Sequence, residues 1–446
     1  MASELAYGLY NYGVGSGIGE VGRCKFDAAT TPTIQHNVTN LTGLTPDPKV
    51  FYFLNKDGQP RLLVAETAYD SSFNPLPSEF RILNAATFAQ VYPTPSGTVQ
   101  WGYGSTTAEK LVNVYAFKRN GTDDYIYGID YDRQTVFRVQ NSSGDTYSFD
   151  TVNKYYFNTA AAQDYGIDVA VDGSNVYALF ISATDVWAGS YNSSTVVKLT
   201  LALALASTPN TNSTLGKNAF GFAEYGSNLY ITSIGGMQQN GFSNGADSKL
   251  EKLVKSTMAS SVLFAGDGTS TTNAAAGDFR DIAIGAGGEV FILTGYYSNI
   301  STGVSTGYLY YTDVATIDGG TGGLISAAGL DNDAITAFAG YFWSLIYNNS
   351  DNMVWFARGN DFAMYKYDDT STNPLVVQGS ITANALASSG TGWSINGAAI
   401  YEPVVTTLAL KAAPGGVSGG TVRAAHPAFA SVSQQAFLER KKLLGI

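Results

Sequence analysis

A short motif recurs seven times along the chain, and its spacing limits what the chain can fold into. In all but one copy a Lys, Arg or Tyr stands directly between two apolar residues, and in the fifth copy Glu251 precedes the Lys. The central positions of the seven copies are Lys25, Arg81, Arg138, Lys198, Lys252, Tyr310 and Lys366. The steps between them are 56, 57, 60, 54, 58 and 56 residues. Such a regular period indicates a repeat architecture, in which each unit packs on its neighbours.

Hairpin signals precede most copies of this motif. Two apolar runs flank a Gly-containing turn at 51–64, 167–180, 220–231 and 282–293, and turns at Asn120-Gly121 and Asn348-Asn349-Ser350 complete a set of six. Apolar runs around such turns are the strongest short-range signal for antiparallel strands. The sequence therefore predicts an all-β protein with seven third strands but six first hairpins.

The missing seventh hairpin is explained if the repeats close into a ring. One unit is then divided between the chain ends, with Leu5–Tyr12 as its second strand and Ile395–Tyr401 as its first. Four strands in about 57 residues, repeated seven times, predict a seven-bladed β-propeller whose four-stranded blade one is shared by the two ends of the chain. We expect the propeller to span residues 1–403.

The best local match to a known repeat lies in the fifth and sixth units. Phe264-Ala265-Gly266-Asp267-Gly268 is followed by the apolar runs 281–284 and 290–293. This pattern resembles the broad NHL/YVTN-like superfamily of β-propeller repeats, and the resemblance covers roughly residues 4–403. Members of this group serve as binding platforms, assembly parts and occasionally enzymes, so the resemblance implies a fold and leaves the function open.

Residues 404–446 form a segment of different character. An extended stretch and a Gly-rich linker lead to a short predicted helix that ends with Arg440, Lys441 and Lys442. The segment has a net charge of +4, which leaves −15 for the rest of the chain. These three basic residues are candidate oligomer contacts, because a basic arm can bind its own acidic ring or a neighbouring copy. The alternative is an unstructured end of the chain.

Composition excludes several functions. The net charge is −11, whereas nucleic-acid binding needs clustered Lys and Arg. Cys24 is the single cysteine, which excludes thiolate zinc sites and disulfides within one chain. A histidine-based site would have to use His36 or His426. We expect no metal, no cofactor, no nucleic-acid partner and no membrane span.

The location of the protein is suggested by its polar residues. Charged residues make up 14% of the chain, against about 25% in average proteins, while Gly, Ser, Thr, Asn and Tyr are abundant. This balance is typical of exported proteins, so we expect an extracellular or cell-surface protein. The first five residues have no signal-peptide pattern.

A binding face is predicted from loop lengths. The second-to-third strand loops at 13–22, 67–78, 182–194, 233–248 and 295–306 are long, whereas those of blades three and seven are short. The candidate ligand-binding residues are the aromatic ones on these loops: Tyr69, Trp187, Tyr191, Phe242, Tyr296 and Tyr297. Aromatic residues among Gly, Ser and Asn are typical of recognition surfaces. They are also ordinary for exposed loops of an exported β protein.

Carboxylates on first strands offer a second kind of site. Asp168, Asp281 and Glu224 would act as an acid/base pair or bind a cation if they met at the mouth of the channel. The alternative is that they hydrogen-bond backbone groups where blades meet.

Three functions stay open. The first is a non-catalytic propeller that binds a glycan, peptide or protein partner through the long-loop face. The second is a structural subunit of a surface or filamentous assembly, joined to other copies of itself by its C-terminal arm. The third is a lyase or hydrolase with carboxylates at the channel mouth.

Overall fold

The computed structural model places most of the chain. It describes residues 4–11, 18–27, 33–44, 47–70, 74–94, 96–159, 163–185, 190–235, 248–266, 278–299, 304–339, 342–349, 351–358, 361–368, 374–388 and 390–401. The C-terminal segment 404–446, with Arg440, Lys441 and Lys442, lies outside the described residues. Among the described helices none is long and apolar enough to cross a membrane.

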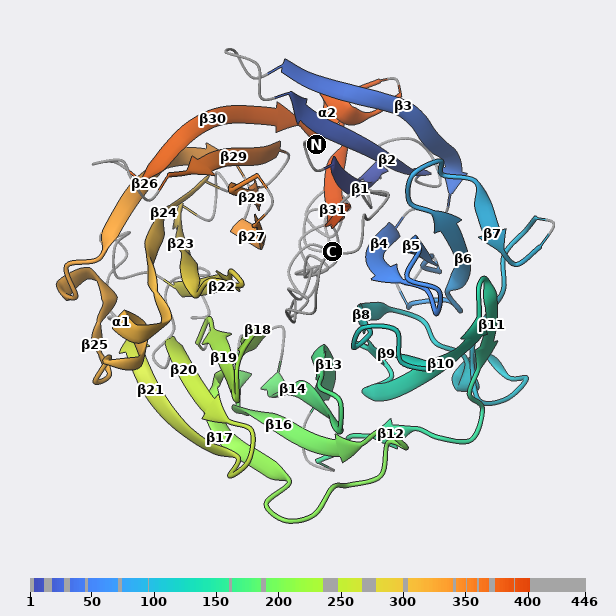
Figure 1. Ribbon diagram of the computed structural model, residues 1–446, viewed down its shortest axis with the longest axis horizontal. Coiled ribbons are helices and arrows are strands. Elements are labelled where there is room, and N and C mark those ends of the chain that lie inside the picture. The colour runs from blue at the N-terminus through green and yellow to red at the C-terminus, as the bar shows by residue number, and fades with distance from the viewer. Residues whose placement is uncertain are drawn as a thin grey trace, which may run out of the picture.

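The described strands form seven antiparallel sheets around a central axis, so the predicted seven-bladed β-propeller is confirmed (Figure 1). From the axis outward, blade 1 is β31 (Ser394–Tyr401), β1 (Glu4–Asn11), β2 (Ile18–Asp27) and β3 (Thr33–Leu44). Blade 2 is β4 (Asp47–Leu54), β5 (Pro60–Thr67), β6 (Glu79–Asn84) and β7 (Gln90–Tyr92). Blade 3 is β8 (Val114–Lys118), β9 (Tyr125–Asp130), β10 (Thr135–Ser143) and β11 (Thr146–Phe149), with β12 (Tyr155–Tyr156) also on β10.

The remaining blades follow the same plan. Blade 4 is β13 (Gln163–Val171), β14 (Asn175–Asp185), β16 (Ser193–Thr200) and β17 (Thr211–Lys217), with β15 (Ser190–Tyr191) on β14. Blade 5 is β18 (Ala219–Tyr225), β19 (Asn228–Ser233), β20 (Lys249–Val254) and β21 (Ala259–Ala265). Blade 6 is β22 (Asp278–Ile284), β23 (Glu289–Asn299), β24 (Val304–Asp313) and β26 (Asp331–Ala339). Blade 7 is β27 (Phe342–Asn348), β28 (Met353–Arg358), β29 (Asp361–Tyr367) and β30 (Leu375–Thr382).

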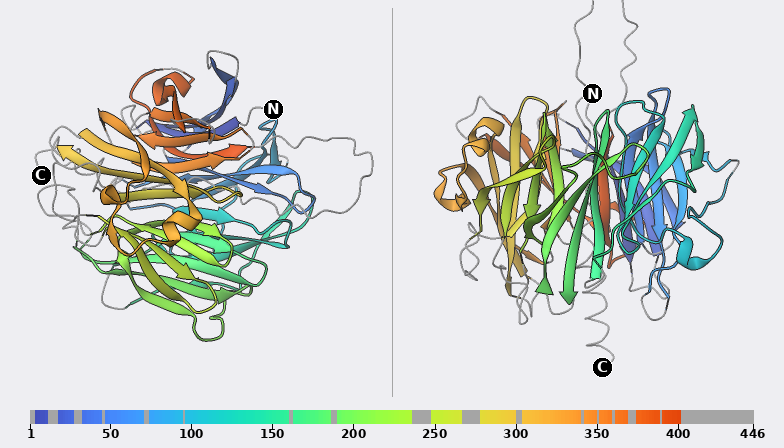
Figure 2. Two further views of the ribbon diagram at one scale, coloured as in Figure 1. Left: turned by 60° about the vertical axis from the view of Figure 1, so that its left-hand side comes forward. Right: turned by 90° about the horizontal axis from the view of Figure 1, so that it is seen from below.

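The predicted ring closure is confirmed. The first strand of blade 1, β31, pairs with β1 from the other end of the chain, with Tyr401 opposite Glu4 and Ala399 opposite Ala6. All seven repeat motifs fall on the third strand of their blade. Seen edge-on in the right-hand view of Figure 2, the strands run between the two faces of a flat ring.

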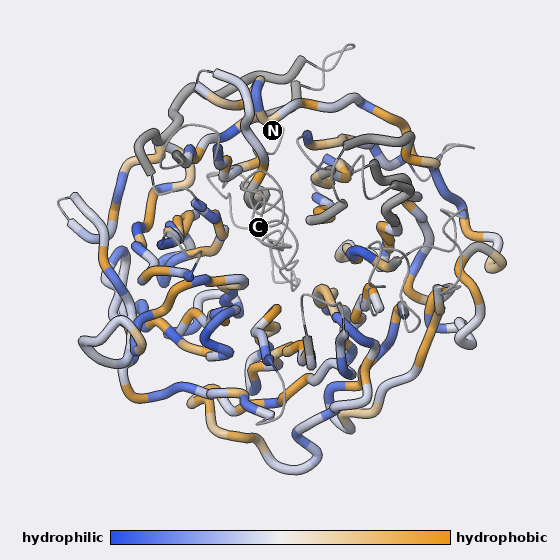
Figure 3. The backbone as a smooth tube through the Cα atoms, turned by 180° about the vertical axis from the view of Figure 1, so that it is seen from behind, coloured by the Kyte–Doolittle hydropathy of each residue, from blue (hydrophilic) through white to orange (hydrophobic). Residues whose placement is uncertain are grey.

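The interior lies between neighbouring sheets. Phe80 of β6 stacks on Trp101, with ring centroids 4.4 Å apart, and Trp101 also stacks on Phe117 of β8. At the junction of blades 1 and 2, a Cβ on Gly8 would lie 2.2 Å from the Pro48 carbonyl oxygen, so the strands approach this closely because Gly8 has no side chain. Figure 3 shows hydrophobic and hydrophilic stretches alternating along the strands.

In the described part of the chain, four short helical segments lie in connections. They are η1 (Thr107–Glu109), α1 (Val314–Asp318), η3 (Ile325–Ala327) and α2 (Ala383–Leu386). The connection that carries α1 reaches from blade 6 to blade 5: β25 (Gly323–Leu324) pairs in parallel with β21, and Asp318 accepts a hydrogen bond of 3.0 Å from the Tyr230 hydroxyl. This connection therefore ties two blades together at the rim.

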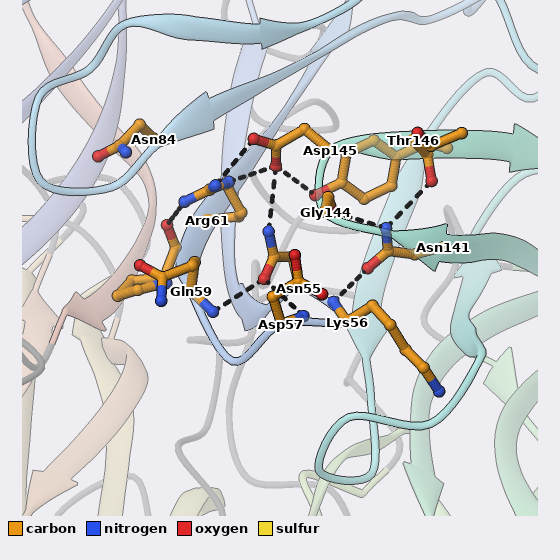
Figure 4. A network of polar contacts seen from close by, with 12 residues as sticks. Asn55, Lys56, Asp57, Gln59, Arg61, Asn84, Asn141, Gly144, Asp145 and Thr146 are labelled. Carbon is orange, nitrogen blue, oxygen red and sulfur yellow. Dashed lines mark hydrogen bonds and ion pairs between the residues drawn. The ribbon is translucent and has the colours of Figure 1, made fainter.

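A polar network joins blades 2 and 3 at the face where first and second strands meet in hairpins (Figure 4). Arg61 Nε and Nη2 donate to the two oxygens of Asp145, at 2.6 and 2.8 Å. Asn55 Nδ2 donates to Asp145 at 3.2 Å, and Lys56 N donates to Asn141 Oδ1 at 2.6 Å. Burial opposes ionisation of Asp145, but the Arg61 hydrogen bonds and charge prevail and lower its pKa. The blades are thus held in register by a bidentate ion pair.

Candidate ligand-binding face

The long-loop face is the face where first strands begin and second strands end. On blade 2, Asp47 at the start of β4 pairs with Thr67 at the end of β5. On blade 3, Val114 at the start of β8 pairs with Asp130 at the end of β9. Residues near these strand ends share one face of the ring, because the first strands of all blades run in the same direction from one face to the other.

Two of the six predicted ligand-binding side chains lie in the described part of this face. Tyr69 is half-buried, and its hydroxyl donates to Asp47 Oδ2 at 3.0 Å. Tyr191, in β15, is 5% exposed. Trp187 and Phe242 lie outside the described residues, and so do the side chains of Tyr296 and Tyr297, whose backbone belongs to β23. Their role in binding stays a prediction.

A row of three stacked tyrosines, which no sequence pattern indicated, also lies at these strand ends. The rings of Tyr115 and Tyr131 have centroids 4.4 Å apart and planes 21° apart, and those of Tyr131 and Tyr165 are 4.4 Å and 26° apart. Tyr131 is therefore sandwiched between a first-strand tyrosine of blade 3 and one of blade 4. Tyr115 and Tyr131 are buried, whereas Tyr165 is half-buried.

A fully buried lysine caps one end of this row. Lys49 of β4 is 1% exposed, and its ammonium lies 4.8 Å from the centroid of the Tyr115 ring. It donates to Asn113 Oδ1 and lies 3.9 Å from Asp47 Oδ2. Burial lowers the pKa of Lys49, while the charges of Asp47, Asp132 and Asp130 oppose this fall. The ammonium is thus held by carboxylates and a ring face together.

Two aspartates at the end of β9 complete this cluster. Asp130 is fully buried and accepts from the backbone N–H groups of Val112, Asn113 and Arg133, at 2.6, 3.0 and 2.8 Å. Asp132 is half-buried and accepts from Asn113 Nδ2 at 2.7 Å. Burial raises the pKa of Asp132 to about 6, and the charge of Asp130 adds to the rise. Asp132 is therefore a carboxyl that titrates near neutrality.

A third aspartate sits at the start of β13. Asp164 is 3% exposed and accepts from Thr159 N at 2.7 Å and from the Ser182 hydroxyl at 2.7 Å. Asp164 and Asp132 both raise the pKa of Tyr165, after burial, which is the main cause of its rise to about 12. Both carboxylates therefore act electrostatically on the tyrosine at the open end of the row.

The predicted catalytic candidates do not meet in one place. Asp168 lies inside β13, where its oxygens accept from Lys118 Nζ at 2.6 Å and from Phe222 N of the next blade at 3.2 Å. Asp281 lies inside β22 and accepts from Leu345 N of the next blade at 2.8 Å. Each is 1% exposed. Both carboxylates therefore join the first strands of neighbouring blades.

Glu224 is placed differently. It lies near the end of β18, toward the face opposite the long loops, and accepts from Lys255 Nζ. Lys255 also donates to Gly226 O at 3.3 Å. A catalytic role for Asp168, Asp281 or Glu224 has no test in these contacts and stays a prediction.

Sequence signals for the missed residues exist but are weak. Tyr131 and Asp132 follow directly after a second strand, in the short second-to-third strand loop of blade 3. Tyr115 and Tyr165 each stand within three residues of the start of a first strand. Among the described residues no group of three or more His, Cys, Asp or Glu side chains has the geometry to hold a metal ion.

No model of a known protein family matches the chain, and no curated protein matches its sequence. In structure it is similar to the periplasmic gluconolactonase of Pseudomonas aeruginosa, with a TM-score of 0.54 and 11% identity over 86% of this chain and 96% of that chain. It is also similar to a putative 6-phosphogluconolactonase from Bacteroides fragilis, with a TM-score of 0.49 and 10% identity over 85% and 95% of the two chains. The WD40 domain of Toxoplasma gondii coronin matches with a TM-score of 0.43 and 9% identity over 81% and 86%.

At 11% identity, the likeness to the Pseudomonas aeruginosa protein shows the fold alone. It does not separate an NHL/YVTN-like group from other propellers, so that narrower resemblance stays a prediction.

Proposed function

We propose that the protein is a non-catalytic binding propeller that takes a ligand on the long-loop face, at the junction of blades 3 and 4. The observation that carries this proposal is the row Tyr115–Tyr131–Tyr165, which presents a half-buried ring at its end beside Tyr191. An aromatic ring that is rigidly backed by two others offers contact area at little cost in side-chain entropy.

The partner class favoured by this geometry is a glycan or a peptide, because both present groups that stack on an aromatic ring. Asp132 and the exposed Gln163 add hydrogen-bonding groups beside Tyr165. An extracellular or cell-surface location, which the composition favours, fits such a role. A location assay with an antibody on intact cells tests that part of the proposal separately.

The test is a pair of glycan and peptide arrays probed with the labelled full chain and with Tyr165→Ala. We expect spots that are bound by the wild type and lost in the variant. Tyr156→Ala is the matched control, since Tyr156 is 55% exposed on β12 at the rim and lies outside the row. Equal binding by the wild type and Tyr165→Ala would contradict the proposal.

A second candidate is a hydrolase that uses Asp132. The observation that favours it is a half-buried carboxyl whose pKa is raised to about 6, which suits general acid/base work. The fold shared with a gluconolactonase suggests a lactone as the first substrate to assay. Hydrolysis of gluconolactone above the spontaneous rate, lost in Asp132→Asn, would establish this function. A wild type that does not exceed the spontaneous rate would remove the lactone version of it.

A further inference from the structure

The tyrosine row has two ends, and the chain itself places a cation on one of them. Each outer ring lies 4.4 Å from Tyr131 with its plane nearly parallel, so Tyr115 and Tyr165 cover opposite faces of Tyr131. The ammonium of Lys49 lies over the ring of Tyr115, 4.8 Å from the ring centroid. The electron-rich faces of this row therefore already stabilise one buried positive charge.

The other end of the row is the outer face of Tyr165. The ring is half-buried, and Tyr131 is its ring neighbour within the described residues. The Tyr165 hydroxyl donates to Gln163 at 3.4 Å, which leaves the ring face unused by that contact. Within the described residues, no Lys or Arg stacks on the Tyr165 ring in the way that Lys49 stacks on Tyr115.

The charges around Tyr165 are negative. Asp132 and Asp164 are the charged groups that act on its hydroxyl, and both raise its pKa. Asp132 lies two residues after the end of β9, and Asp164 lies near the start of β13, so the two carboxylates come from different blades. A positive group beside the ring would interact favourably with both.

The Tyr191 side chain is an independent observation that points to a ligand site beside Tyr165. Its side chain is 5% exposed, and its hydroxyl has no hydrogen-bond partner within the described residues. Tyr191 and Tyr165 both act electrostatically on Tyr131 and raise its pKa, and Tyr165 acts in the same way on Tyr191. A buried hydroxyl without a partner is destabilising, and a ligand group that hydrogen-bonds to it removes this cost.

We infer that the outer face of Tyr165, with Tyr191, Asp132 and Asp164 around it, is a site for an ammonium group, either a protonated amine or a quaternary ammonium. The inference rests on the proposed function, since it names the chemistry of the ligand for the same face. The group stacks on Tyr165 as Lys49 stacks on Tyr115, its charge is balanced by the two carboxylates, and the ligand covers the Tyr191 hydroxyl. Aromatic rings with nearby carboxylates are the usual surroundings of such cations.

The test compares choline with its neutral tert-butyl analogue, which has the same shape without the charge. Binding of each to the full chain is measured by isothermal titration and by ligand-observed NMR. We expect choline to bind about tenfold more tightly than the neutral analogue, and added salt to weaken choline alone. Equal affinities, or no choline binding, would overturn the inference without any variant being needed.

Variants then locate the site. Tyr165→Leu removes the ring face and should abolish the preference for choline, whereas Tyr165→Phe keeps the ring and should keep the preference. Asp132→Asn should reduce the preference by about threefold, because one of two nearby charges is lost. Thermal unfolding of each variant checks that the fold is intact, and Tyr156→Leu serves as the distant control. Unchanged binding in Tyr165→Leu would place choline elsewhere and refute the site.

The two proposals fail in different ways. Array spots that depend on Tyr165, together with equal affinities for choline and its neutral analogue, would keep the binding face and reject the ammonium site. A face that loses no array binding in Tyr165→Ala and shows no choline binding would reject both.

Discussion

Asp168, in the innermost strand of blade 4, accepts a hydrogen bond from the backbone N–H of Phe222, in the innermost strand of blade 5. Asp281 repeats this relationship between blades 6 and 7, with Leu345 as the donor. Both aspartates follow a β-bulge in their strand, after Gly166 and after Phe279. An extra residue at the same place in two blades turns the carboxylate toward the next blade.

Asp168→Asn should lower the free energy of unfolding. The Asp168 carboxylate is paired with Lys118 at 2.6 Å in a buried place, and an amide leaves the ammonium without its counter-charge. We expect a loss of about 1–3 kcal/mol by urea unfolding. A double-mutant cycle with Lys118→Met should show coupling, and Asp57→Asn on the exposed β4–β5 turn is the control. Additive effects of the two substitutions would contradict a direct ion pair.

Lys49→Met should lower the free energy of unfolding by more than the similar sizes of the two side chains suggest. The methionine fills the same space, but Asp47 and Asp132 lose the positive charge that balances them. A loss of about 3 kcal/mol is expected from removing one partner of a buried charged cluster. Lys56→Met is the matched control, because Lys56 pairs with an exposed Asp124 and should show little change. Similar stabilities of the two variants would refute this account.

Asp132 should make stability depend on pH below neutrality. Its pKa is about 6 in the folded protein and about 3.9 in an unfolded chain, so the folded state binds the proton more tightly. Asp132 therefore contributes stability at low pH that is lost as the pH rises from about 4 through 6. The free energy of unfolding, measured with urea at several pH values in this range, should depend less on pH in Asp132→Asn than in the wild type. Parallel curves for the two proteins would contradict the raised pKa.

Gly128→Ala should disrupt the core of blade 3. A Cβ on Gly128 of β9 would lie 2.2 Å from Phe137 Cζ, and Phe137 is fully buried, so the ring has to move against its neighbours. The expected loss is about 1–3 kcal/mol in urea unfolding. Gly323→Ala is the control, because a Cβ there meets nothing within 4 Å, and its stability should stay within about 0.5 kcal/mol. Equal effects of the two substitutions would show that the Phe137 ring adapts.

The mass of the protein in solution tests whether the basic C-terminal segment joins copies of the chain. If Arg440, Lys441 and Lys442 join copies of the chain, light scattering at several concentrations should find assemblies for the full chain and monomers for a version that ends at Pro403. Monomers in both cases would remove the assembly function and leave the binding function.

The repeat made the fold predictable, whereas the site was predictable in part. Each of the seven motif centres, from Lys25 to Lys366, marks a third strand. These strands could be predicted because apolar alternation and turn residues are local features of the sequence. Tyr191 was singled out because it lies on a long loop. Tyr131 and Tyr165 were not, because their significance depends on contact with each other across two blades.

The sequence by itself determined the number of blades, the order of their strands and the closure of the ring by β1 and β31. It could do so because the repeat period and the turn residues are local features of the chain. The tertiary structure decided that Lys49, Tyr115, Tyr131 and Tyr165 form one row, and that Asp168 and Asp281 join blades. Apart from the stack of Tyr115 on Tyr131 within blade 3, these contacts link residues of different blades. Their geometry follows from how the blades pack around the axis, which no local pattern in the sequence specifies.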